Sequence, residues 1–105
     1  MNFLMSRFYG FFTPLNSKKI VERIYFGTTG VNSAKQIVTN GTTGTVFLFI
    51  IGYGASQNIY IVNHKVGGIC ALHSKSDITI THDVNTGVVT ITTSQSYYCT
   101  VLKIL

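Results

Sequence analysis

Three histidines are the side chains of this sequence best suited to hold a metal ion. His64, His73 and His82 follow one another at intervals of nine residues. If they occupied equivalent places in consecutive strands, their imidazoles could converge on an ion such as Zn²⁺. Strong zinc motifs, however, contain a closely spaced pair of ligands, which these histidines lack. We therefore expect three separate, solvated histidines at strand ends or turns, and no metal or other cofactor.

Hydrolytic chemistry would require a carboxylate behind a histidine, and the chain has only three acidic residues. Asp83 adjoins His82, but neighbouring residues of a strand point to opposite faces. Asp77 could reach His73 and a nearby serine only through an unusual loop. The sequence contains no G-x-S-x-G segment either. It therefore favours a protein that is not an enzyme, with a small histidine-dependent hydrolase as the less favoured alternative.

Tyrosines near polar turns form a second candidate site. Tyrosine together with asparagine, glutamine and serine is the composition of adaptable recognition surfaces, including surfaces that stack against sugars. The candidate ligand-binding residues are Tyr53, Gln57, Asn58, Tyr60, Asn63 and Tyr97. The alternative is that these tyrosines pack at the margins of a sheet with their hydroxyls in water.

Charged residues are few and do not gather into a binding site. The 105 residues include eight Lys or Arg and three Asp or Glu, for a net charge of +5. Only Lys18, Lys19 and Arg23 form a basic cluster, whereas nucleic-acid-binding proteins usually concentrate their bases on one element. We expect no dedicated nucleic-acid site. The low charge and the 46% hydrophobic content also exclude an intrinsically disordered chain.

The segment from residue 46 to 51 is the element around which the rest of the fold is expected to form. It is apolar at every position, has glycines on both sides, and is typical of a strand buried on both faces. Residues 77–82 and 88–92 alternate between apolar and polar types around a turn. They predict a hairpin in which Gly87 has a positive φ and Val89 pairs with Ile80.

The remaining apolar runs complete a single all-β domain. Residues 18–26 predict an edge strand, residues 35–39 a weak second strand and residues 97–105 a last strand. About eight strands spaced by about 8–12 residues, without a convincing internal helix, predict an antiparallel β-sandwich over residues 17–105. The sandwich is expected to be jelly-roll-like or of Greek-key type, with an open barrel as the alternative. Cys70 and Cys99 are expected to be free, buried thiols rather than a disulfide.

Residues 1–16 predict an apolar arm or short helix in front of the sandwich. The large side chains of this segment are Phe3, Leu4, Phe8, Phe11 and Phe12. So much apolar surface predicts a contact between copies, with a homotrimer favoured. It could instead fold back over an open end of the sandwich or dock on a protein partner. The segment lacks the pattern of a signal peptide, and no apolar run is long enough for a transmembrane helix.

The C-terminal half, from DITITHDVNTGVVTITTS through YYCTVLKIL, resembles the distal receptor-binding domain of bacteriophage tail-fibre-like proteins. The resemblance covers residues 42–105 in style, without a diagnostic motif, so no site residue is transferred from the family. It implies a homotrimeric virion or prophage protein that binds a bacterial surface glycan at the virion or another assembly surface. The expected function is therefore a non-enzymatic module for binding or assembly.

Overall fold

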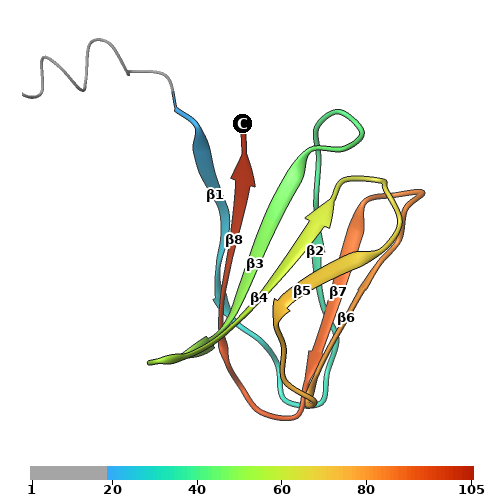
Figure 1. Ribbon diagram of the computed structural model, residues 1–105. Helices are drawn as coiled ribbons and strands as arrows, with labels where there is room; N and C mark the ends of the chain where they lie inside the picture. Colours follow the sequence, from blue (N-terminus) through green and yellow to red (C-terminus); the bar gives the residue numbers. More distant parts are fainter. Residues whose placement is uncertain (1–18) are drawn as a thin grey trace, which may run out of the picture.

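The computed structural model describes residues 19–105, which form eight strands and no helix. A five-stranded sheet with the order β1-β8-β3-β4-β5 faces a three-stranded sheet with the order β2-β7-β6, and every strand pair is antiparallel (Figure 1). The predicted all-β sandwich is confirmed. The strands are β1 (Val21–Thr28), β2 (Lys35–Val38), β3 (Val46–Tyr53), β4 (Ser56–Asn63), β5 (Ile69–His73), β6 (Ile78–His82), β7 (Val88–Thr93) and β8 (Tyr98–Ile104).

Strand β3 is the central strand of the larger sheet, as its uninterrupted apolar run predicts. Phe47, Phe49 and Ile51 point toward the three-stranded sheet and have no exposed surface. Leu48 and Ile50 point the other way and are only half-buried. The prediction of full burial on both faces is therefore wrong for the described residues, because the second sheet covers only one face of β3.

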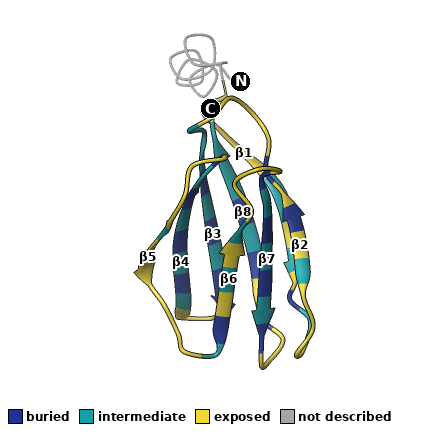
Figure 2. Cartoon of the chain, turned by 90° about the vertical axis from the view of Figure 1, so that its right-hand side faces the viewer, coloured by how far each residue is buried: buried dark blue, intermediate teal, exposed yellow. Residues whose placement is uncertain are grey.

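The hydrophobic core lies between the two sheets and draws on both of them. β-branched and aromatic side chains fill it because they fit a pleated surface with one buried face. Within the described residues the core consists of Ile37, Phe47, Phe49, Ile51, Tyr60, Val62, Ile78, Val89, Ile91, Tyr97, Cys99 and Val101. Strand β5 contributes least to it and is exposed over most of its length (Figure 2).

The β6–β7 hairpin forms where the alternating pattern predicts it. Gly87 has a φ of 81°, and its amide donates a hydrogen bond of 2.8 Å to the carbonyl of Asp83. The register differs from the prediction by two residues, because Ile80 lies opposite Ile91 and Val89 lies opposite His82. The connection between paired positions is therefore two residues longer than the sequence suggested, which shifts every pair along the strand.

The edge strand predicted over residues 18–26 is confirmed. Strand β1 is an edge of the larger sheet, and the four-residue strand β2 is an edge of the smaller one. The last strand predicted over residues 97–105 is β8, which lies between β1 and β3 and pairs with both. No helix of residues 19–105 is long and apolar enough to cross a membrane.

The two cysteines are free, as expected, but only one of them is buried. Cys99 points into the core from β8 and has no exposed surface. Cys70 is exposed on β5, which corrects the expectation of two buried thiols. Strands β3 and β4 lie between β8 and β5, so the thiols are kept apart. The predicted arm or helix over residues 1–16 lies outside the described residues.

Candidate functional site

The outer face of the larger sheet, turned away from the three-stranded sheet, carries a continuous apolar patch. The strand register places Leu48 between Leu102 on β8 and Ile61 on β4. In the next outward row, Ile50 lies beside Ile59. Together with the end of β8, these positions form what we call the outer-face cluster: Leu48, Ile50, Ile59, Ile61, Leu102 and Ile104.

Members of the outer-face cluster differ in burial from their neighbours on the same strands. Each member is half-buried, whereas the inward-pointing residues that alternate with them on β3 and β4, and Cys99 and Val101 on β8, are buried. The three-stranded sheet packs on the inner side, so the partial burial of the cluster comes from neighbours within its own sheet. Exposed apolar patches of several hundred Å² mark interaction sites in soluble proteins. The outer-face cluster is therefore a candidate interaction surface.

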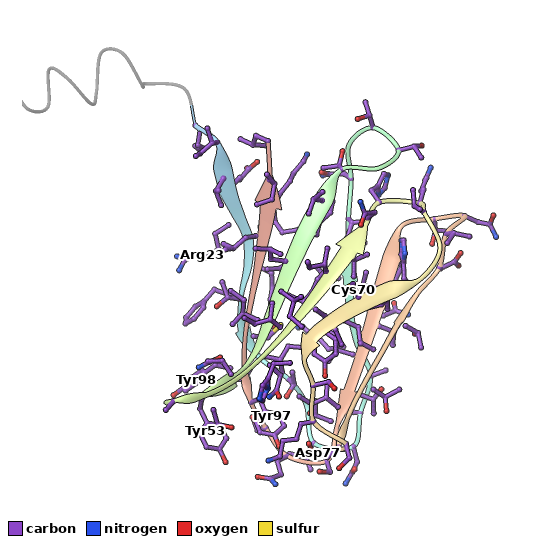
Figure 3. The ribbon with its side chains drawn as sticks, viewed as in Figure 1. Arg23, Tyr53, Cys70, Asp77, Tyr97 and Tyr98 are labelled. Carbon is purple, nitrogen blue, oxygen red and sulfur yellow. The ribbon has the colours of Figure 1, made fainter. Side chains whose placement is uncertain are left out.

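The rim of the outer-face cluster is almost free of charge. On β1, Arg23 lies opposite Leu102 and its guanidinium carbon is 5.1 Å from the ring centroid of Phe26. The Phe26 ring is 59% exposed. On the β5 side, the exposed Cys70 lies opposite Ile61 (Figure 3). Arg23 is the one charged residue among the described residues that the register aligns with the cluster.

A pair of stacked tyrosines forms a second, smaller candidate site near the β3–β4 turn. The ring centroids of Tyr53 and Tyr97 are 5.5 Å apart and the ring planes are inclined by 28°. Tyr97 is buried, and its backbone amide donates a hydrogen bond of 2.9 Å to Oγ1 of Thr29. Tyr53 is 47% exposed. Tyr53 therefore offers an aromatic surface on a rigid support, as a sugar-stacking residue requires.

Hydrogen bonds and a lysine surround the Tyr97 hydroxyl. The hydroxyl donates to the carboxylate of Asp77, and Oγ of Ser94 donates to the same carboxylate oxygen at 2.8 Å. These bonds, the one from Tyr97 first, lower the pKa of Asp77. The bond to Asp77 in turn raises the pKa of Tyr97. Lys75 Nζ lies 5.6 Å from the Tyr97 ring centroid, so the buried ring also has a cation beside it.

Of the six predicted ligand-binding residues, only Tyr53 and Tyr97 come together. Asn58 is buried and donates a hydrogen bond of 3.0 Å from Nδ2 to the carbonyl of Ile51. Tyr60 is a core residue whose buried hydroxyl has no hydrogen-bond partner among the described residues, and burial raises its pKa. The predicted roles of these two side chains as surface ligands are wrong, because inward positions of β4 belong to the core.

The other two predicted residues are occupied by local contacts. Gln57 donates from Nε2 to the carbonyl of Gly54 at 3.0 Å, across the β3–β4 turn. Asn63 lies at the far end of β4 and donates to the carbonyl of Gly44 at 3.3 Å. The polar neighbours of Tyr97 are Asp77, Lys75 and Ser94, and sequence reasoning did not connect any of them with this tyrosine. Asp77 and Tyr97 are twenty residues apart, and only the packing of the two sheets brings them together.

His64 is buried, contrary to the expectation of three solvated histidines. Oγ1 of Thr39 donates to the carbonyl of Gly87 at 2.7 Å and lies 2.8 Å from Nδ1 of His64. A hydroxyl has one proton to donate, so Nδ1 of His64 must carry the proton in this contact. Burial, followed by the charge of Lys65, lowers the pKa of His64 and favours its neutral form.

The three histidines do not converge. Nε2 of His82 accepts a hydrogen bond of 3.4 Å from the backbone amide of Lys65. His73 lies on β5, an edge strand of the larger sheet, and its Nδ1 is 3.3 Å from Oδ1 of Asn58. Residues 19–105 contain no group of three or more His, Cys, Asp or Glu side chains that could hold a metal ion. The side chains considered for a hydrolase are thus engaged in separate local contacts.

The predicted oligomer contact through Phe3, Leu4, Phe8, Phe11 and Phe12 lies outside the described residues. Comparisons with known proteins supply no further assignment, since no family model, curated protein or solved structure matches this chain. The outer-face cluster and the Tyr53–Tyr97 pair therefore remain as the two candidate surfaces of the sandwich.

Proposed function

We propose that this protein is a non-enzymatic module for binding or assembly, and that it works through the outer face of its larger sheet. One observation supports this proposal above all others. The outer-face cluster holds six aliphatic side chains on adjacent strands, half-buried and without a covering layer in the described part of the chain. When another apolar surface covers such a sheet face, the free energy falls by about 25 cal/mol for each Å² of apolar surface removed from water.

The polar side chains support binding rather than chemistry. The Asp77 carboxylate is held by Tyr97 and Ser94. His64 is buried in its contact with Thr39. A general base must instead present a lone pair to a substrate proton, whereas the second oxygen of the Asp77 carboxylate is buried. These groups stabilise the sandwich, and the surface that is left to act is apolar.

Dye binding tests the proposed function. Anilinonaphthalene sulfonate (ANS) fluoresces when it binds exposed apolar surface. At protein concentrations low enough to keep copies apart, the full chain should bind ANS, and Leu48→Lys should weaken that binding. Thr79→Lys, an exposed position on β6, is the matched control and should leave it unchanged. If the monomeric full chain bound no ANS, its own residues would cover the outer face. That result would refute the proposal.

Carbohydrate recognition at Tyr53 is a second candidate, favoured by the stacked Tyr53–Tyr97 pair. The half-exposed ring could stack on the apolar face of a sugar, while Tyr97 holds it in place. A tail-fibre-like receptor-binding domain, the family that the C-terminal half resembles, would combine such a glycan contact with assembly into a homotrimer on a virion. This setting is part of the proposal.

A glycan array with the full chain tests this second candidate. Binding to bacterial surface glycans should fall when Tyr53 is replaced by alanine. Tyr98→Ala is the control, because Tyr98 is also exposed, at 57%, but has no place in the stacked pair. Equal losses in the two variants, or no glycan bound by the native chain, would remove the glycan site.

A further inference from the structure

We infer that the occupant of the outer face is another copy of this chain, so that the outer-face clusters of neighbouring copies pack against one another. This inference rests on the proposed function and names its partner. Three properties of the described residues support it: the size of the face, its composition and the placement of charge.

The outer face has the size of a protein interface. Five strands about 4.8 Å apart, with central strands of seven or eight residues at about 3.3 Å per residue, give about 500 Å² in flat projection. Because side chains project from the sheet, the accessible area of the face is larger than this flat projection. It approaches the roughly 800 Å² per partner of a standard interface. A small ligand would leave most of such a face in water.

The composition of the face is that of a permanent homo-oligomer. Interfaces between copies are more apolar than those of transient complexes, which resemble the rest of the protein surface. Leu48 has Ile61 and Leu102 as its partners on the two neighbouring strands. Ile50 lies between Ile59 on β4 and Thr100 on β8. A different protein would need polar or charged complementarity to be selected, and this face offers little of it.

Charge placement allows two copies to approach face to face despite the net charge of +5. Arg23 stands at the β1 edge, with its guanidinium over Phe26. Lys103 points inward and donates to Oδ1 of Asn40 at 2.7 Å, and Lys35 lies over the Tyr25 ring. The central part of the face thus carries no positive charge that a second copy would have to meet.

Sheet packing supplies a geometry for this contact. Two sheets stack about 10 Å apart with their strands inclined by about 30°, which lets aliphatic side chains interdigitate. A closed two-fold or three-fold arrangement covers the cluster in every copy at once. In either arrangement Leu48 and Ile61, at the middle of the face, become fully buried.

Light scattering of the full chain at micromolar concentration tests the inference. The expected mass is two or three times the 11.6 kDa of one chain. Leu48→Lys should return it to one chain, because it places a charge at the middle of each contact. Ile61→Thr, a milder change to a residue that favours strands, should weaken association while keeping the fold. Thr79→Lys should leave the mass unchanged, and circular dichroism should show the same strand content in all three variants.

A mass of one chain for the native protein would overturn the inference. So would an oligomer whose mass Leu48→Lys and Ile61→Thr both leave unchanged, since its contact would lie elsewhere. The ANS measurement keeps the two proposals distinguishable. A monomer that binds ANS through the outer face overturns only the self-association, whereas a monomer that binds none overturns the proposed function as well.

Discussion

Replacing Gly87 by alanine should destabilise the sandwich by more than the cost of placing alanine at a positive φ. Gly87 is buried in the β6–β7 turn with a φ of 81°. A Cβ atom at this position would lie 2.6 Å from Cε1 of His64 and 3.0 Å from the backbone oxygen of Thr39. The added methyl group would therefore meet a buried ring and a main-chain atom, and neither can move freely.

Gly68 allows the two contributions to be separated. It has a φ of 87°, but a Cβ atom added there would meet no atom within 4 Å. The left-handed conformation costs a non-glycine residue about 1–2 kcal/mol at either site. Overpacking adds about 1–3 kcal/mol at Gly87 alone. We expect a loss of about 2–5 kcal/mol for Gly87→Ala and about 1–2 kcal/mol for Gly68→Ala.

Urea unfolding followed by circular dichroism measures both losses. With a slope of about 1–3 kcal/mol per molar urea, the difference between the two variants should be resolved in their midpoints. Adding His64→Ala to Gly87→Ala should recover part of the loss, because it removes the closest contact. Equal midpoints for the two glycine variants would refute the packing of His64 against this turn.

Three further predictions concern the core and its titratable groups. Phe49→Ala should cost about 3–5 kcal/mol in urea unfolding, because Phe49 has no exposed surface; a cost below about 1 kcal/mol would mean that β3 is misplaced. The lowered pKa of His64 implies that the unfolded chain takes up a proton first, so stability should fall as the pH drops below about 6.5. Urea midpoints should show this dependence in the native chain and in His73→Gln, and lose part of it in His64→Gln. Burial raises the pKa of Cys99 to about 12, so a thiol reagent should modify it only as fast as the protein unfolds, which mass spectrometry of labelled peptides can follow.

Local patterns were enough to predict the strands, because the apolar or alternating pattern of each strand lies within a few consecutive residues. The Val46–Ile51 run predicted the central strand, and the Gly87 turn predicted the hairpin. The same run was expected to be buried on both faces. Its apolar content was a sound signal, but a single sequence does not specify which layer covers each face.

Sites that depend on long-range packing could not be predicted in this way. The contact between Asp77 and Tyr97 joins the start of β6 to the residue before β8, and depends on the two sheets facing each other. Asn58 and Tyr60 have polar atoms typical of surface residues, yet the alternation of β4 places both inside. His64 is likewise buried because three distant segments, which contain Thr39, His64 and Gly87, meet in the fold. The nine-residue spacing of the histidines does not indicate this contact.

The position of β8 between β1 and β3 has a consequence for synthesis of the protein. Both long edges of β8 are paired, so β1 and β3 each lack a neighbour until β8 has been made. Forty-four residues lie between the end of β3 at residue 53 and the start of β8 at residue 98. At about 5–20 residues per second, this leaves the apolar edge of β3 open for about 2–9 s on the ribosome. Such an edge is prone to pair with other nascent chains during this interval.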